Sequence, residues 1–453
     1  MRASATAIIL GGALLGLAGC GGTPFPAMPG MSGLSDLTTR FATGPDAAMR
    51  RLAPETDGTS ATGAQDRDRS DAASPIIAEL ATRRSVLEPG SPYAEIAGRV
   101  LASGARVEAA ELEVAQLRAR AADWNWLPTL GPTVSLSALG DVVADLVLNQ
   151  VLFDNGRKRA ERDLARAEVE RAAVRLSDST NARVADALRL QIRAAEGRET
   201  ATHFAAAHKD MAHFEWVMSE RVKGGVSNRS DLVVLRQKLA DIAADRDRAT
   251  EDAARAEAEL AQMADGAGNI RGIGTLSGPV ADATPLGVLM ARADRDKTEA
   301  EARIARSGFL PGLGFEASAR SGQGGLTAAL PNGVGIGTGA ALKATEASIT
   351  AAEERILAAR EEAAREEAGL LREIAALERQ VAEAQDLARQ AKTTLDLFQR
   401  QYEGGQRRVM EVVGVYETFA DATARALRLK YDHARAEVAL ARLRGVLADG
   451  AAI

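Results

Sequence analysis

The pattern of hydrophobic and polar positions predicts two very long helical segments, at residues 157–222 and 351–402. Both lack proline and are dense in Ala, Leu, Glu and Arg, a composition typical of long helices and coiled coils. A continuous helix of the first length would span on the order of 100 Å. A Gly-Gly pair follows each segment, and a second helical stretch returns, over 230–263 and 411–447. The pattern therefore predicts two long antiparallel coiled-coil hairpins.

A shorter helix is expected before each hairpin, at 92–124 and 285–307. A Leu-Pro pair ends each one, because proline disfavours helix in the residue before it. Short segments with a period of two follow, and they predict strands. The predicted strands are 133–139, 142–153, 313–320 and 334–339, with a turn near Gly140 and Asp141 in the first pair.

Strands that are apolar on one side and small or polar on the other suit a wall between lipid and a lumen. Two strands alone cannot form a stable barrel. An open sheet edge is also untenable in lipid, so that closure would need strands from other copies of the chain.

The chain contains an internal repeat. Residues 220–261 align without a gap on 400–441, which places the Gly-Gly pair of the first half on that of the second. The run Ala-Arg-Ala-Glu at 254–257 falls on the same run at 434–437. This register predicts a tandem duplication, with a first repeat at 84–266, a connecting segment at 267–281 and a second repeat at 282–453.

The N-terminal residues have the layout of a lipoprotein signal. Arg2 and an apolar stretch at 7–17 precede Leu17-Ala18-Gly19-Cys20, which resembles a bacterial lipobox. This interpretation predicts a signal peptide at 1–19, lipid on Cys20 and a tether over 20–83. The tether is expected to be mostly irregular from Gly21 to about Ser74. The alternative is an ordinary signal peptide that ends by chance in a cysteine. Gly21, where a retained inner-membrane lipoprotein commonly has Asp, favours the outer membrane.

Composition excludes several classes of protein. The 453 residues contain one cysteine, so neither an intramolecular disulfide nor a multi-cysteine zinc site can form. The net charge of −6 gives no basic surface for nucleic acid. Outside the signal, no stretch is long and apolar enough for a transmembrane helix. The scarcity of aromatic residues (4%) favours thin helices over a β-sandwich.

Candidate chemistry is sparse. His203, His208 and His213 are five residues apart, which rotates each by about 140° around a helix, so they do not share one face. No nucleophile elbow, phosphate-binding loop or paired metal-ligand motif appears. We therefore expect no catalytic residue, no metal and no cofactor.

Two motifs carry a resemblance to a known family. The run 150–160, QVLFDNGRKRA, is similar to a strand-to-helix entry of the form P-L-F-D-x-G-R-x-R-A. Arg221, Gly225 and Ser230-Asp231 approximate an R-x-x-x-G-x-x-S-x-x-D pattern at a hairpin tip. Together with the duplication, they make residues 84–449 resemble the TolC-type outer-membrane efflux protein family.

The resemblance implies a mainly α protein with membrane β-strands. Three protomers would each give four strands to one barrel, and their helices would form a hollow periplasmic cylinder. Such a homotrimer is the exit duct of a tripartite efflux pump or a type I secretion system in a Gram-negative outer membrane. Its partners would be a periplasmic membrane-fusion adaptor and an inner-membrane transporter of the RND or ABC type. The alternative is a lipid-anchored periplasmic coiled-coil scaffold without channel activity.

The resemblance also implies roles for residues at the tips. Tyr402 and Arg407 fall on the periplasmic gate, with Asp231 and Ser230 as their acceptors, and Glu411 falls on a lumenal acidic ring. The paired tip residues that would dock the adaptor are Gly224, Gly225, Gly404 and Gly405.

Simpler roles stay open for these residues, since Asp231 could be a helix N-cap and the glycines could be turn residues only. Two positions depart from the family pattern. Gly414 replaces the second acidic ring, and residues 339–343 lack the Pro-Leu-Phe entry.

Overall fold

The computed structural model describes residues 74–453, except 105, 137–141, 278–282, 334 and 451–453. All of these residues belong to the compact unit formed by 67–453. Cys20, the signal segment and the turn at Gly140 lie outside the described residues. The elements are α4 (Pro75–Ala81), α5 (Pro92–Ser103), α6 (Arg106–Asp123), β1 (Thr129–Leu136), β2 (Val142–Phe153), α7 (Arg157–Lys223), α8 (Arg229–Met263), η1 (Ala267–Asn269), α9 (Leu286–Ser307), β3 (Gly312–Ser318), β4 (Gln323–Ala329), α10 (Thr338–Glu403) and α11 (Val409–Leu443).

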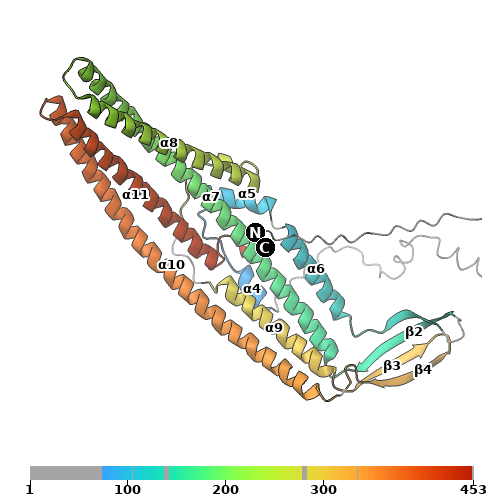
Figure 1. The fold of residues 1–453 in the computed structure, drawn as a ribbon. Coiled ribbons are helices and arrows are strands. Elements are labelled where there is room, and N and C mark those ends of the chain that lie inside the picture. Colours follow the sequence, from blue (N-terminus) through green and yellow to red (C-terminus); the bar gives the residue numbers. More distant parts are fainter. Residues whose placement is uncertain (1–73, 105, 137–141, 278–282, 334, 451–453) are drawn as a thin grey trace, which may run out of the picture. The chain divides into compact units, whose positions relative to one another are not determined.

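Two long helical hairpins, α7 with α8 and α10 with α11, dominate the unit (Figure 1). Their helices have 67 and 35 residues in the first hairpin, and 66 and 35 in the second. The hairpins predicted from the sequence are therefore confirmed. The turns are also alike, because Gly225 and Gly405 have φ angles of 72° and 73°, a region that glycine adopts without strain.

The four strands form one antiparallel sheet in the order β1-β2-β3-β4 (Figure 1). Strand β2 occupies the predicted residues 142–153, and β1 begins four residues before the predicted strand at 133. The predicted strand at 334–339 is wrong. The fourth strand is β4, because a tight turn with Gly322 at φ 62° returns the chain directly against β3, and α10 already begins at Thr338.

The predicted first helix, 92–124, is also wrong as a single element. It is divided into α5 and α6 at Gly104, whose backbone is extended. Gly104 is the C-cap of α5, and the Arg183 side chain of α7 packs closely against it. Glycine lowers helix propensity, which fits a helix end at this position.

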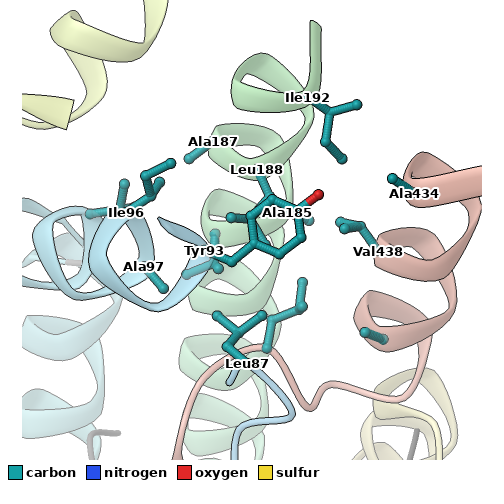
Figure 2. Close-up of a cluster of buried hydrophobic side chains, with 14 of the residues drawn as sticks. Leu87, Tyr93, Ile96, Ala97, Ala185, Ala187, Leu188, Ile192, Ala434 and Val438 are labelled. Carbon is teal, nitrogen blue, oxygen red and sulfur yellow. The ribbon is translucent and has the colours of Figure 1, made fainter. Parts of the chain in front are cut away.

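Helix α7 is the element on which the others pack. Its contacts include α4, α5, α6, α8, α9 and α11. The largest apolar cluster surrounds its middle. Figure 2 shows Tyr93 and Ile96 of α5 against Leu188 of α7, with Val438 of α11 on the other side. Full burial of one such side chain stabilises the folded state by about 1.5–3 kcal/mol.

Two buried amide side chains on α7 hold the chain segments that leave the hairpins. Asn181 accepts a hydrogen bond from the Leu447 amide at 2.8 Å, after the end of α11. Gln191 donates to the carbonyls of Ile270 and Gly272, at 3.1 and 2.6 Å, after the end of α8. Since both side chains are almost fully buried, these bonds fix where the two segments lie.

The long helices α7 and α10 differ sharply in burial. Twenty-three of the 67 residues of α7 are buried. In α10 only four of 66 are, and Leu357, Leu371 and Leu387 are exposed large apolar residues. Helix α10 contacts α9 and α11 but leaves the rest of its surface uncovered in the single chain.

Gly197 of α7 allows α7 and α8 to approach closely. A Cβ there would lie 2.7 Å from the Ala249 carbonyl oxygen and 2.9 Å from Cβ of Ala253. We expect Gly197→Ala to destabilise the protein by about 1–3 kcal/mol through overpacking. Gly98→Ala, on α5 with no atom within 4 Å, is the matched control. It should be neutral or slightly stabilising, because alanine favours helix. Thermal unfolding followed by circular dichroism measures both, and equal melting temperatures would contradict the packing argument.

Candidate functional site

The tips of the hairpins carry the residues that the sequence singled out. At the first tip, the Gly224 amide donates to the Glu220 carbonyl and the Val226 amide to the Arg221 carbonyl, at 3.0 and 2.9 Å. At the second tip the bonds from Gly404 and Gln406 repeat this pattern. Val226 is 80% exposed at the end of the first tip.

The interpretation of Asp231 as a helix N-cap is wrong. Helix α8 begins one residue before Ser230, and its N-cap is Asn228, whose side chain accepts from the Ser230 amide at 3.2 Å. Asp231 lies in the first turn, where a carboxylate interacts favourably with the helix dipole. Its side chain is thus not needed as a cap.

Arg407 bonds within its own hairpin. It donates to Gln401 Oε1 at 2.9 Å and to Glu411 Oε2 at 3.1 Å, and its guanidinium lies 4.4 Å from the centre of the Phe398 ring. These contacts bring the candidate gate arginine together with the candidate acidic residue. Within the described residues of this chain, no hydrogen bond joins Arg407 to Ser230 or Asp231.

Tyr402 connects the two hairpins through its ring. The guanidinium of Arg221 lies 5.5 Å from the ring centre, and Phe214 packs edge-on at 6.3 Å. Both partners belong to α7. Cation–π contacts of this kind contribute about 0.5–1 kcal/mol at exposed sites. The predicted gate tyrosine therefore lies at a contact between hairpins.

An apolar cluster joins the hairpins on the side of the tips. It includes Met211, Phe214 and Met218 of α7, Leu232 and Leu235 of α8, Leu395 of α10, and Val409, Val412, Val413 and Tyr416 of α11. All four long helices contribute to it. The cluster makes the two tips one packed body within the chain.

A row of polar contacts connects α7 with α11 between this cluster and the middle of the unit. Arg435 donates to Glu196 at 2.7 Å. Glu199 accepts from Lys430 at 2.7 Å and from the Tyr431 hydroxyl at 2.5 Å. Burial opposes the charge on Glu199, but these two donors outweigh it and lower the pKa of the carboxyl. Burial and the same hydrogen bond raise the pKa of Tyr431.

The row continues toward the tips. His203 Nε2 donates to the Ala420 carbonyl at 2.9 Å, and burial lowers the pKa of His203, which favours the neutral ring. The Tyr416 hydroxyl donates to Asp210 at 2.7 Å. Glu417 forms an ion pair with Lys238 of α8. Sequence inspection missed these contacts, because most of the partners are about 180 to 240 residues apart and no local pattern marks them.

The sheet has two chemically distinct faces, which follow from the strand register and the alternation of side chains. One face is mainly apolar: Leu130, Pro132, Val134, Ala144, Leu146, Leu148, Leu313, Phe315, Ala317, Leu326 and Ala328. The other is mainly small or polar: Thr129, Gly131, Thr133, Asp145, Asn149, Gly314, Glu316, Ser318, Gln323, Gly325 and Thr327. Gln150 is an exception on the apolar face, and Val147 and Val151 are exceptions on the polar face. Leu130, Val134 and Leu326 are exposed.

Within the described residues, no three His, Cys, Asp or Glu side chains are placed to hold a metal ion. Over the same part of the chain, no helix combines the length and apolar character needed to cross a bilayer. The polar groups of the site serve instead to connect helices.

Residues 286–446 match the sequence profile of the family described as outer membrane efflux protein. No curated protein sequence matches the chain.

Solved structures resemble the fold over most of its length. A membrane protein from Pseudomonas aeruginosa has a TM-score of 0.69 at 17% identity, covering 80% of this chain and 91% of that one. The CmeC outer membrane channel of Campylobacter jejuni has 0.66 at 12%, covering 79% and 86%. The open state of the MtrE outer membrane channel of Neisseria gonorrhoeae has 0.65 at 17%, covering 81% and 94%.

At these identities the solved structures establish the fold, while the profile match concerns the second half of the chain. Both agree with the hairpins and the two-faced sheet. The chain therefore has the fold of the TolC-type outer-membrane channels, and its resemblance to the outer membrane efflux protein family is confirmed.

Proposed function

We propose that the protein is a passive outer-membrane channel, the exit duct of a tripartite efflux pump or a type I secretion system. The observation that carries the proposal is the four-stranded sheet, which is apolar on one face and polar on the other. In a membrane barrel the apolar face would contact lipid and the polar face would line the lumen. A periplasmic scaffold would have no use for exposed leucine and valine on this face.

The functional form is a homotrimer. Strands β1 and β4 are the edges of the sheet, and each has an unpaired side within the described residues. An open edge is untenable in lipid, so that strands of other copies must pair with it. The exposed leucines of α10 support the same conclusion, because neighbouring copies would cover them.

The hairpin tips dock the partners. Gly224, Gly225, Gly404 and Gly405 form the turns, with Val226 exposed beside them. A periplasmic membrane-fusion adaptor would bind here and connect the duct to an inner-membrane transporter of the RND or ABC type. The family resemblance supports this assignment, and the exposed apolar side chain is compatible with it.

The gate is formed by Tyr402 and Arg407, with Ser230 and Asp231 as acceptors, and Glu411 lies in the lumen. Arg407 and Glu411 are paired at 3.1 Å in the single chain. In the assembled trimer Arg407 would exchange partners, or add one, between hairpins of different copies. A bidentate-capable arginine suits such an exchange.

Cys20 is the lipid anchor. The lipobox at Leu17–Cys20 supports this proposal, and Gly21 favours sorting to the outer membrane. Diacylation of one residue gives stable attachment, whereas a single chain binds only marginally.

The channel proposal predicts conductance. The purified protein should run as a heat-modifiable trimer in detergent and should form discrete single channels in planar bilayers. A protein that stays soluble and non-conducting after removal of the lipid anchor would be a scaffold, and the channel proposal would fail.

The gate proposal predicts that Tyr402→Phe combined with Arg407→Ser raises single-channel conductance. Loss of a hydrogen bond to a charged group destabilises the closed state by about 1.5–3 kcal/mol. Arg408→Gln is a control, because this neighbouring arginine carries no assigned gate role and glutamine is not a favoured N-cap residue at the start of α11. Unchanged conductance in the double variant, or an equal rise in the control, would remove the gate assignment.

The lipid proposal predicts that Cys20→Ser abolishes incorporation of labelled palmitate. The variant should still fold, because none of the helices and strands that the structure describes contains Cys20. Incorporation of label into the variant would show that the acyl chain is attached elsewhere.

A further inference from the structure

All four connections between helices and strands lie at the same end of the sheet. The strands are antiparallel in the order β1-β2-β3-β4, so that the starts of β1 and β3 and the ends of β2 and β4 share that end. There the chain passes to α6, α7, α9 and α10 (Figure 1). Each connection has an exposed large apolar side chain in it or beside it: Trp126, Phe153, Leu310 and Ile336. Such side chains are typical of a boundary between membrane and water.

The parts of these four helices nearest the sheet are strongly basic. We define the basic band as the six residues of each helix that adjoin the sheet: 118–123, 157–162, 302–307 and 338–343. They contain two, four, two and one lysine or arginine residues, nine in total, against the two acidic residues Asp123 and Glu161. The whole chain has a net charge of −6. Positive charge is therefore concentrated next to the sheet.

The opposite ends of the long helices show no such excess. The corresponding six-residue ends at the hairpin tips are 218–223, 229–234, 398–403 and 409–414. They contain four basic and four acidic residues. The basic band is thus not a general feature of helix ends in this chain.

The start of α7 carries cations where helix stability disfavours them. Arg157, Lys158 and Arg159 are its first three residues, and its first turn has no acidic residue. The dipole of a helix is positive at its N-terminus, so that cations there are unfavourable. Glu161 forms ion pairs with Arg157 and Lys158, at 3.1 Å in both cases, and Asp154 accepts backbone amide hydrogen bonds at the helix start. These two carboxylates leave an excess of positive charge that an external anion would compensate.

Four cations of the basic band have no ionic partner within the described part of the chain. Arg118 and Arg120 of α6, Arg159 of α7 and Lys343 of α10 are exposed, and no ion pair or side-chain hydrogen bond joins them to another described residue. Exposed lysine and arginine beside an apolar membrane surface attract anionic lipid headgroups. Arginine also binds phosphate through two parallel N–H groups.

The length of the strands is compatible with a basic band at the level of the headgroups. Strand β2 has 12 residues and is about 40 Å long, at about 3.3 Å per residue. Strands of membrane barrels tilt by about 35–45°, which reduces the height of β2 to about 30 Å. The hydrocarbon core of a typical bilayer is also about 30 Å thick. The basic band then begins where the hydrocarbon core ends.

We propose that the basic band binds anionic phospholipid headgroups in the membrane leaflet at the helical end of the sheet, and that it prefers them to zwitterionic headgroups. The apolar residues of the connections contact the acyl chains next to these headgroups. The position of the band at a leaflet rests on the proposed channel function. The preference for negative headgroups rests on the charge of the band.

Two sets of substitutions test the proposal. The band variant replaces the four exposed cations without an ionic partner: Arg118→Gln, Arg120→Gln, Arg159→Gln and Lys343→Gln. The matched control replaces four exposed arginines that also have no ion pair among the described residues but lie outside the band: Arg355→Gln, Arg360→Gln, Arg379→Gln and Arg428→Gln. Arg355, the nearest of these to the sheet, lies 17 residues after the start of α10, or about 25 Å along the helix. This exceeds the Debye length of about 8–10 Å at moderate ionic strength.

The first experiment measures which lipids stay bound. Each purified protein is mixed in detergent with equal amounts of phosphatidylglycerol and phosphatidylcholine, and native mass spectrometry counts the bound lipids. The wild type should retain phosphatidylglycerol over phosphatidylcholine by at least about tenfold, because several cations act together. The ratio should fall below about twofold in the band variant and stay near that of the wild type in the control. A wild type without preference, or an equal ratio in both variants, would overturn the proposal.

A salt series tests the proposal without any substitution. In the wild type, about 1 M NaCl should reduce the preference for phosphatidylglycerol below about threefold, because salt screens exposed charges. A preference that salt leaves unchanged would contradict binding by the exposed cations. Excess inorganic phosphate at constant ionic strength should leave the bound phosphatidylglycerol in place. Displacement by phosphate would indicate a site for small anions, and the lipid proposal would fail.

Conductance separates this proposal from the channel function. A trimer that conducts but shows no preference between the two lipids would overturn only the role of the basic band. A protein that retains phosphatidylglycerol selectively, loses this preference in the band variant and does not conduct would overturn only the channel proposal.

Discussion

A helix about 100 Å long must be covered by neighbours along its whole length, and this constraint decides the rest of the structure. Helix α7 meets it within the chain: α9 and α6 cover its beginning, α5 and α11 its middle, and α8 its second half. Nine of its 23 buried positions are alanine, which lets backbones approach closely. Helix α10 has the same length and four buried residues. Within one chain, neighbouring helices therefore cover α7, whereas most of the surface of α10 stays uncovered.

Apolar and polar contacts have separate tasks in this arrangement. The apolar clusters supply most of the stabilisation, because burial is favourable wherever area is removed from water. The polar contacts between α7 and α11 instead determine register, since Glu196, Glu199 and Asp210 each meet a specific partner. Many of these pairs are partly exposed, so that each contributes modestly to stability. Their number along one interface is what makes sliding of one hairpin against the other unfavourable.

The elements predicted correctly from the sequence are those fixed by local signals. The long helices follow from uninterrupted helix-forming composition, and their ends follow from the Gly-Gly pairs. Strand β2 was predicted correctly over 142–153, because its segment is long and both of its ends are clearly marked in the sequence. The tip residues were placed at the turns for the same reason.

The elements missed depend on distant partners. The end of α5 at Gly104 lies beside Arg183 of α7, a neighbour that local sequence does not reveal. Strand β4 has the sequence QGGLTAA, which is poor in strand-forming residues, and it exists because β3 presents an edge for it to pair with. At the start of α8 the sequence offers two good N-cap candidates, Asn228 and the Ser-Asp pair two residues later. The Asn228 side chain accepts a hydrogen bond of 3.2 Å from the Ser230 amide, so that Asn228 is the N-cap. The bond between Tyr416 and Asp210 joins positions 206 residues apart, and only the packed hairpins bring them together.

The location of these contacts bears on where the proposed trimer can move. Within one chain, an apolar cluster and a row of polar pairs hold the two hairpins together from Glu196 to the tips. Between copies, the surface available is the poorly buried α10, whose exposed leucines are separated by many charged residues. Such a surface is less apolar and more hydrated than the clusters inside the chain. A duct built this way should open by movement of whole hairpin pairs against their neighbours, because the contacts within each pair are the better buried.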